Sequence, residues 1–171
     1  NNEKAIENYT RSMKIKEELG DKAGVASTLN NLGLLYYDTK NYEKAIEFIT
    51  KGLVNYKEFG NERGVASSLS LLGDVYDAKG DFETSMKYFL DALSIREKLG
   101  DKFGITSNLM NIGIGQVHAK KYKEGMENLN QAIVLSKEID AKEGLWESYL
   151  AMSSAYFDLG DYKNAYEYRK L

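Results

Sequence analysis

The residues of this chain that could do chemistry are few, and none of them forms the set that a reaction needs. His118 is the one histidine and there is no cysteine, so a zinc or copper site would need carboxylates for nearly all its ligands, which is uncommon. Asp74 and Asp77 are about one helical turn apart and could share a cation, but two carboxylates alone make a weak site. No serine or threonine stands in a nucleophile arrangement with the histidine and a carboxylate. We therefore expect no catalysis, no cofactor and no metal.

Two close glycines, Gly113 and Gly115, give the one pattern that is similar to a phosphate-binding loop. Such a loop follows a strand and precedes a lysine, whereas this stretch lies inside a helical pattern. It is not a nucleotide site. We expect Gly113 to serve packing between helices, and the alternative is a soft point at which the helix bends.

Composition narrows the class of partner. The net charge is −3 and the isoelectric point is near 5.4, which argues against nucleic acid, because binding phosphates needs a concentrated basic surface. No run of about 18 apolar residues could span a membrane, and no secretory segment is recognisable, so the expected location is cytoplasmic. The chain of 171 residues has no proline, which suits uninterrupted helices.

One eight-residue stretch returns along the chain at a fixed period. Residues 69–76 read LSLLGDVY, and LNNLGLLY stands forty residues earlier. LMNIGIGQ follows forty residues later, and YLAMSSAY forty after that. A fixed period of this size is the signature of a repeat architecture, in which each unit buries its apolar face against its neighbours.

Turn residues divide each period into two segments of roughly 18 residues with helical spacing. A glycine that can end a helix stands before a side chain that can cap the next one at Gly20-Asp21, Gly60-Asn61 and Gly100-Asp101. The breaks halfway through the periods are Lys40-Asn41, Gly80-Asp81, Lys120-Lys121 and Gly160-Asp161. The boundary at Lys120-Lys121 is the least clear, since it lacks both the glycine and the cap.

We expect an all-α chain of nine helices, because apolar residues recur at steps of three and four in each segment. A lone leading helix over residues 3–19 precedes four pairs, the last cut short at Leu171. The predicted domain organisation is one array over 1–171. It comprises a lone second helix in 1–20, full repeats in 21–60, 61–100 and 101–140, and a truncated repeat in 141–171. Because the sequence begins and stops inside repeat units, we expect it to be part of a longer protein.

The residues that recur in these units resemble the pattern of the tetratricopeptide repeat (TPR) family. Its first helix has a large apolar residue, then Leu-Gly, then Tyr, as in Leu29/Leu32/Gly33/Tyr36 and Leu69/Leu72/Gly73/Tyr76. Its second helix has small-x-x-x-aromatic-x-x-small, as in Ala45/Ile49/Gly52 and Ser85/Phe89/Ala92. The third repeat departs at Gln116 and Gly125, and the fourth at Ser153. The unit length resembles both spindle-orientation adaptors of the Pins/LGN type and bacterial regulatory TPR arrays.

The resemblance implies a right-handed superhelix (α-solenoid) in which the first helix of each pair lines a concave groove. That groove would be built from residues 22–39, 62–79, 102–119 and 142–159. We expect Trp146 to be packed between helix pairs. The candidate peptide contacts in the groove are Asn30, Asn31, Leu34, Tyr37, Asp38, Ser70, Asp74, Asp77, Met110, Asn111, Ile114, Glu147, Leu150 and Phe157.

Charge is unevenly distributed over these segments. Residues 23–39, 64–78, 103–119 and 143–159 contain no lysine or arginine, although the chain has 23 such residues. The groove should therefore attract cationic segments and repel anionic ones. TPR domains that hold carboxylate tails use a clamp of Lys, Arg and Asn on groove positions, and no cation stands there in this sequence. We reject that clamp.

Asn30, Asn31 and Asn111 offer a donor and an acceptor together, so they could grip the backbone amide of a peptide. The alternative is that they only solvate the groove, and the acidic residues have the same two interpretations.

The function predicted from these patterns is a non-catalytic protein- or peptide-binding module, part of a larger regulatory or scaffold protein. Its partner would be basic and apolar rather than acidic. The alternative is a sensory TPR region of a signalling kinase or cyclase whose catalytic domain lies outside this sequence. End-to-end self-association of the open repeat ends is a third possibility.

Overall fold

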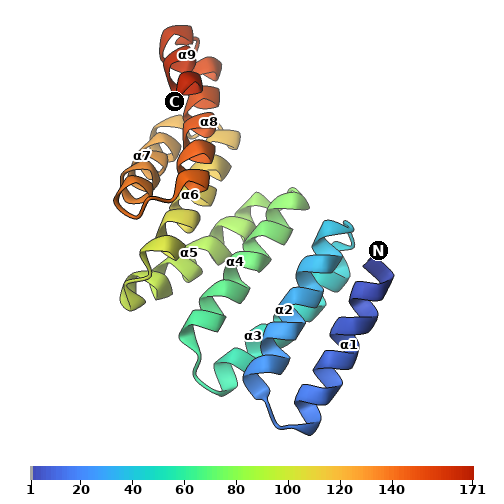
Figure 1. The fold of residues 1–171 in the computed structure, drawn as a ribbon. Helices are drawn as coiled ribbons and strands as arrows, with labels where there is room; N and C mark the ends of the chain where they lie inside the picture. The colour runs from blue at the N-terminus through green and yellow to red at the C-terminus, as the bar shows by residue number, and fades with distance from the viewer. Residues whose placement is uncertain (1) are drawn as a thin grey trace. The chain divides into compact units, whose positions relative to one another are not determined.

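The computed structural model describes residues 2–171, with side chains from Lys4 onward, and every secondary-structure element among those residues is an α-helix. This confirms the all-α fold class and the expected succession of helices (Figure 1). The helices are α1 (Asn2–Glu18), α2 (Lys22–Asp38), α3 (Tyr42–Glu58), α4 (Glu62–Ala78), α5 (Phe82–Leu99), α6 (Lys102–His118), α7 (Tyr122–Glu138), α8 (Lys142–Asp158) and α9 (Tyr162–Lys170).

The chain divides into two compact units, and the division falls inside α5. The first unit ends at Ile95, and the second begins at Arg96 with the last turn of that helix. The repeat pattern placed a boundary five residues later, at the turn before Asp101, and did not anticipate a division within a helix. The single array over 1–171 stays a prediction, and each unit is described by itself below.

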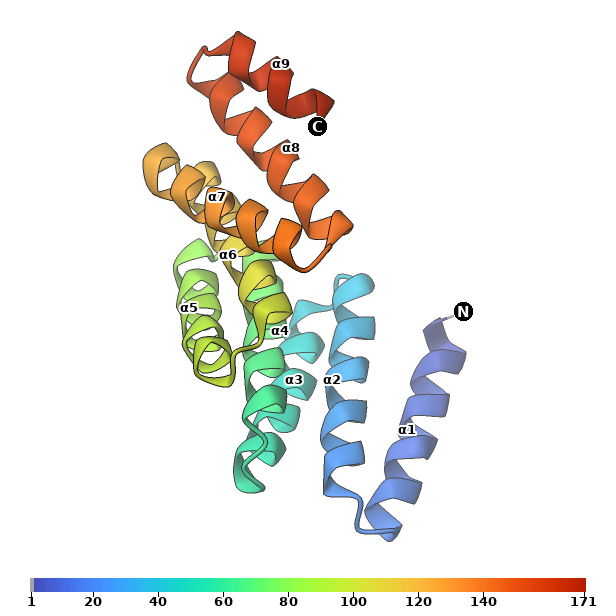
Figure 2. The same ribbon diagram turned by 60° about the vertical axis from the view of Figure 1, so that its left-hand side comes forward.

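The first unit stacks α1 to α4 side by side, with α5 against α4 (Figures 1 and 2). Its core contains Ile49, Leu72, Val75 and Ala92, all nearly inaccessible to solvent. These side chains come from three different helices, so no single helix pair of the unit buries its own apolar face. The stacking of neighbours supplies the burial, as expected for a repeat fold.

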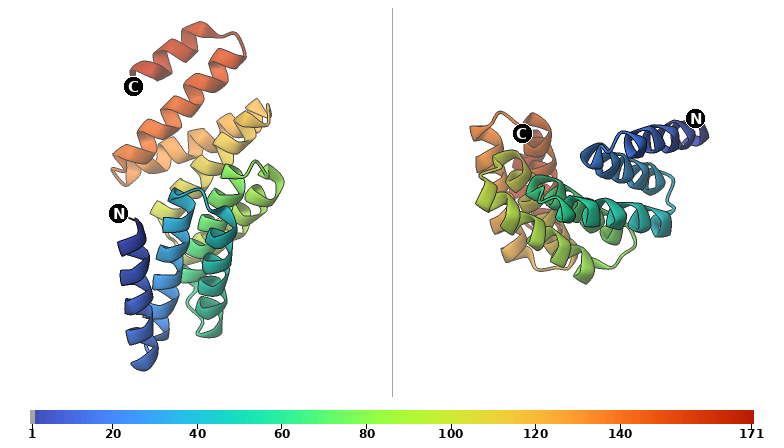
Figure 3. Two further views of the ribbon diagram at one scale, coloured as in Figure 1. Left: turned by 90° about the vertical axis from the view of Figure 1, so that its right-hand side faces the viewer. Right: turned by 90° about the horizontal axis from the view of Figure 1, so that it is seen from below.

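The second unit contains α6, α7, α8 and α9, each of which packs against the next (Figure 3). Leu129 and Met152 are fully buried in it, and Ile112 nearly so. A serine replaces the repeated glycine in its last helix pair. Ser153 Oγ donates a hydrogen bond of 2.8 Å to the carbonyl of Ala165 across α8 and α9, so this larger residue is held by a bond that glycine could not make.

The repeated glycines permit a close approach of the two helices of a pair. A carbon added at Gly113 would lie 2.7 Å from Leu129 Cγ and 2.9 Å from the carbonyl oxygen of Gly125. At Gly33 it would meet the side chain of Ile49, with the carbonyl oxygen of Ala45 at 3.2 Å. These contacts support the packing role expected for Gly113.

A second cross-helix contact also repeats, with one substitution. Tyr36 stacks on Phe48 with ring centroids 5.3 Å apart, and Tyr76 stacks on Tyr88 at 5.5 Å. The fourth repeat forms the same contact between Tyr156 and Tyr168 at 5.4 Å. In the third repeat the two positions are Gln116 and Asn128, and Asn128 Nδ2 donates to Gln116 Oε1 at 2.8 Å. The departure at Gln116 is thus matched by a compensating departure on the partner helix.

The turns follow the predicted chemistry at most boundaries. The expected cap side chains accept backbone N–H bonds, as Asp21 does from Gly24 at 2.8 Å and Asp101 does from Gly104 at 3.1 Å. Five glycines adopt positive φ after a helix, but at three turns the residue in this conformation is Lys40, Lys120 or Asp140. A residue with a Cβ is strained there. The turn at Lys120, predicted to be the least clear boundary, also lacks a side-chain cap hydrogen bond at Lys121.

Replacing Lys120, which has φ of +60°, by glycine should raise stability. Glycine adopts this left-handed conformation without the clash of a Cβ, and we expect a gain of up to about 1 kcal/mol in the free energy of unfolding. The matched control is Glu127→Gly, at an exposed position in the interior of α7, where glycine should cost about 1 kcal/mol. Urea unfolding followed by circular dichroism measures both, and a loss for Lys120→Gly would contradict this account of the turn.

Two glycines of the second unit should respond oppositely to alanine. Gly113→Ala places a carbon against backbone and should destabilise by at least about 1 kcal/mol, since overpacking typically costs this much or more. Gly144 lies in the first turn of α8, and an added carbon there meets nothing closer than Ser136 Oγ at 3.5 Å. Gly144→Ala should therefore be neutral or stabilising, by less than about 1 kcal/mol. Equal losses of unfolding free energy for both variants in urea unfolding would contradict the packing role of Gly113.

Candidate functional site

In the first unit, predicted contact residues from α2 and α4 gather around Tyr37. The hydroxyl group has a raised pKa, caused first by burial and then by the negative charge of Asp74, with smaller effects of Tyr42, Asp77 and Asp38. Burial alone raises this pKa, and the carboxylates raise it further because a phenolate is disfavoured beside them. The surface is acidic and aromatic together.

We call this surface the α2–α4 face. Asn31 and Asp38 are exposed on α2, and Leu34 is 42% exposed between them. Ser70, Asp74 and Asp77 on α4 are half-buried. The face therefore combines amide, apolar and carboxylate groups that a partner could reach. Its residues are Asn31, Leu34, Tyr37, Asp38, Ser70, Asp74 and Asp77.

Asn30 does not belong to this face, and its prediction as a groove residue is wrong. It is 7% exposed, and its Nδ2 donates to Ser68 Oγ of α4 at 2.8 Å. Its side chain also covers Gly52, where an added carbon would lie 2.5 Å from Asn30 Oδ1. Asn30 is thus a structural amide between α2, α3 and α4. The small residue Gly52, together with the serine at 68, was the signal in the sequence for this placement.

In the second unit, a cavity of about 470 Å³ lies between α6 and α8, and we call it the α6–α8 cavity. Five predicted residues line it together: Met110, Asn111, Ile114, Glu147 and Leu150. Its wall is mainly apolar, with the amide of Asn111, the carboxylate of Glu147 and the imidazole of His118 as polar groups. Apolar walls with a few polar groups are typical of binding sites.

The two aromatic residues Trp146 and Phe157 of α8 lie in different surroundings. Trp146 was expected to be packed between helix pairs, but it is 59% exposed and lines the α6–α8 cavity. Phe157 is not part of the cavity wall. It is 62% exposed and meets Tyr162 edge-on at 5.3 Å.

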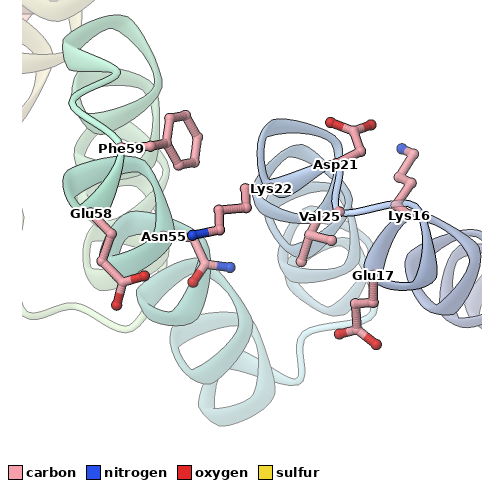
Figure 4. Close-up of a pocket in the computed structure, with 9 residues that line it drawn as sticks. Lys16, Glu17, Asp21, Lys22, Val25, Asn55, Glu58 and Phe59 are labelled. Carbon is pink, nitrogen blue, oxygen red and sulfur yellow. The ribbon is translucent and has the colours of Figure 1, made fainter.

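A further cavity, of about 260 Å³, lies where α1, α2 and α3 meet in the first unit (Figure 4). No predicted residue lines it. Its wall mixes charges of both signs, and Lys16 is already engaged through a 2.9 Å hydrogen bond from its Nζ to Thr28 Oγ1. We assign it no ligand. The lining residues are Lys16, Glu17, Gly20, Asp21, Lys22, Val25, Asn55, Glu58 and Phe59.

The described residues do not contain a cluster of three or more histidine, cysteine or carboxylate side chains that could hold a metal ion. Nor is any helix in that part of the chain long and apolar enough to span a membrane. The chemistry available at the α2–α4 face and at the α6–α8 cavity is hydrogen bonding, charge attraction and apolar contact.

Comparison with solved structures shows how widely the fold occurs. BtubC from P. vanneervenii shares 16% identity with a TM-score of 0.86, over 99% of this chain and 71% of that one. The Rap conjugation gene regulator of plasmid pLS20, in complex with a Phr peptide, shares 19% identity with a TM-score of 0.80, over 96% of this chain and 46% of that one. A signal-transduction ATPase of Pyrococcus horikoshii with a tetratricopeptide repeat sensor shares 19% identity with a TM-score of 0.82, over 99% and 26%.

The chain thus spans less than half the length of the latter two proteins, and identities this low establish the fold alone. No curated protein matches the sequence. Two family models described as tetratricopeptide repeat match it, one over residues 1–58 and the other over residues 66–99 and 147–168. Together they account for more than half of the sequence and include the Leu-Gly-Tyr motif of both repeats in the first unit. The chain belongs to the tetratricopeptide repeat family.

Proposed function

We propose that the chain is a non-catalytic module that binds a protein segment or peptide through the first helices of its repeats. The observation that carries this proposal is the gathering of carboxylates around the half-buried Tyr37 on the α2–α4 face. Carboxylates that lie beside apolar and aromatic surface attract a partner that brings positive charge together with apolar groups.

The chemistry of the two surfaces defines the partner. The carboxylates of the α2–α4 face favour lysine or arginine side chains. The apolar wall of the α6–α8 cavity, with Met110, Ile114 and Leu150, favours an aliphatic or aromatic side chain. Asn31 and Asn111 can each donate to a peptide carbonyl and accept from a peptide N–H. We therefore propose a basic and apolar peptide, held by its backbone as well as by its side chains.

The comparisons support a binding role of this type. A Rap regulator of similar fold was solved with a peptide bound, and an ATPase of similar fold carries its repeats as a sensor. For this chain we propose a regulatory or scaffold role within a larger protein. A sensory role in signal transduction, in which binding changes the state of an attached enzyme, is the second candidate. Self-association through the open repeat ends stays a prediction, which light scattering at several concentrations would test.

Charge reversal on the α2–α4 face should abolish capture of basic peptides. We expect an array of charge-varied peptides to retain basic, apolar sequences on the unaltered chain. Binding should fall at least roughly tenfold in Asp74→Lys/Asp77→Lys and weaken with added salt. The matched control is Glu83→Lys/Asp91→Lys, which makes the same charge change on exposed positions of α5 and should bind normally.

Circular dichroism would confirm that both double variants are folded, and Asp74→Asn/Asp77→Asn provides a milder version of the same test. Selection of acidic peptides, or equal binding by the face variant and the control, would refute the assignment of this face.

The electrostatics of the α2–α4 face can be measured without any ligand. Asp74 and Asp77 both raise the pKa of Tyr37, because their charges disfavour the phenolate. Asp74→Asn/Asp77→Asn should therefore lower the pKa of Tyr37. The pKa should stay above its usual value, since burial is the largest cause of the shift. Titration of ¹³Cζ-labelled tyrosine by NMR measures this, with Tyr88 as the internal control, and an unchanged Tyr37 pKa would contradict the negative potential.

A further inference from the structure

The last turn of each second helix carries one side chain that is directed at a glycine eight residues later. In the first case this side chain is Lys16. A carbon added at Gly24 would lie 2.9 Å from Lys16 Cδ, so the lysine stem lies across the glycine. Its Nζ donates to the carbonyl of Gly24 at 3.3 Å and to Thr28 Oγ1 at 2.9 Å. Because Gly24 has no side chain, it leaves a gap on the surface of α2, and the Lys16 side chain fills that gap. We call the gap at this glycine, and at its equivalents in later repeats, the seat.

The same seat is filled in the next two repeats. Tyr56 places its ring against Gly64. Arg96 covers Gly104, where an added carbon would lie 2.5 Å from Arg96 Cδ, and its Nη1 donates to the Gly104 carbonyl at 2.7 Å and to Asn108 Oδ1 at 2.6 Å. The chain therefore shows twice that a basic side chain can cover this glycine, in each case beside an acidic cap residue, Asp21 or Asp101. In the fourth repeat the cap is Ala141, and the carboxylates near the glycine are Glu143 and Glu147.

The fourth seat is different, because the corresponding residue is Ser136. Its hydroxyl is fully buried and has no hydrogen-bond partner among the described residues. A carbon added at Gly144 would find Ser136 Oγ at 3.5 Å and Thr106 Cγ2 at 3.9 Å as its nearest neighbours. Gly144 is therefore less covered than Gly24, Gly64 and Gly104, because the residue at the covering position is the short side chain of Ser136.

A cavity of about 320 Å³ lies over this open glycine, between the first turns of α6 and α8. We call it the Gly144 cavity. Two carboxylates and one ammonium group line it, together with the 68% exposed ring of Phe103. It shares Met110 and Glu147 with the α6–α8 cavity, so the two are adjacent. Its lining residues are Phe103, Thr106, Ser107, Met110, Ala141, Lys142, Glu143, Gly144 and Glu147.

We propose that the Gly144 cavity receives an arginine or lysine side chain of the bound partner, which would cover Gly144 as Lys16 and Arg96 cover the equivalent glycines Gly24 and Gly104 within the chain. The carbonyl of Gly144 already accepts from Ser148 Oγ at 2.7 Å. The equivalent carbonyl of Gly24 accepts from Thr28 Oγ1 at 2.7 Å and from the Lys16 ammonium as well. One more donor can therefore be accommodated at Gly144.

The remaining contacts of the proposed side chain follow from its chemistry. Glu143 and Glu147 lie at the cavity and would lower the cost of desolvating the cation. The exposed ring of Phe103 offers a face for a guanidinium or for an alkyl stem. This proposal rests on the proposed function and names one side-chain class that the partner must carry.

The test uses the intact chain and a ligand reduced to one residue. We would record ¹H–¹⁵N NMR spectra during titration with Nα-acetyl-arginine-N-methylamide, then with the lysine analogue. Acetyl-citrulline-N-methylamide, which is nearly isosteric with arginine but neutral, is the ligand control. We expect saturable shifts centred on the amides of Thr106, Ser136 and Gly144 with at least one of the two cations. Citrulline should bind at least tenfold more weakly. Equal shifts with citrulline, or no shifts at these amides with either cation, would overturn the proposal.

Ser136→Arg should fill the seat from within, as Arg96 does, and should abolish the shifts while the chain stays folded. Val134→Arg is the matched control, because it adds the same residue to the exposed side of α7 and should leave the shifts intact. Should Ser136→Arg not fold, Gly144→Gln fills the cavity from α8 and serves in its place. Shifts that persist in a folded, filled variant would place the cation elsewhere.

The outcome can be separated from that of the proposed function. A basic peptide from the array that binds equally to the unaltered chain and to Ser136→Arg, yet is lost in Asp74→Lys/Asp77→Lys, would support the α2–α4 face and refute the seat. Arginine binding at Gly144 in a chain that captures no peptide would support the seat and refute the proposed function.

Discussion

The structure depends on how closely the two helices of each pair approach. At Gly113 the opposing Gly125 carbonyl leaves no room for a Cβ, and at Gly33 the side chain of Ile49 occupies that room. Close approach brings the aromatic or amide pair one turn away into contact, and it sets the spacing at which the next helix stacks. Where a serine stands instead, at Ser153, a hydrogen bond to the facing carbonyl of Ala165 accompanies the larger side chain. The repeat thus tolerates a change at its tightest contact only with a compensating bond.

The fold could be predicted from the sequence because the repeat presents the same local evidence several times. One ambiguous turn, such as Lys120-Lys121, is interpreted by comparison with its clearer counterpart at Gly80-Asp81. The errors arose where a residue's environment depends on another helix. Asn30 looks like a surface amide until Ser68 and Gly52 are placed beside it. Trp146 looks like a core residue, but it is exposed and lines the α6–α8 cavity. Helical spacing fixes the face of a helix that a residue occupies, but not what covers that face.

The same distinction applies to the candidate surfaces: features of one segment could be predicted, whereas features that depend on a neighbouring helix could not. The absence of lysine and arginine from the first-helix segments is a property of the sequence, so the acidic character of the α2–α4 face was predictable. The seat at Gly144 was not, because Ser136 by itself is an unremarkable helical serine. It becomes informative when Lys16, Tyr56 and Arg96 are seen to cover the equivalent glycines. A cavity of this type results from a missing side chain, and a sequence shows which residue is present rather than which volume is left empty.

The exchange of an aromatic stack for the Gln116–Asn128 amide pair has a consequence for how the chain responds to its solvent. Stacked rings such as Tyr36 and Phe48 are held largely by the exclusion of water, whereas an amide pair competes with water and with urea for the same donors and acceptors. The side-chain contact between α6 and α7 at this position should therefore break more easily than a ring stack when solvent reaches it. We therefore expect hydrogen exchange to be faster in the α6–α7 hairpin than in the α2–α3 hairpin, where the rings are stacked.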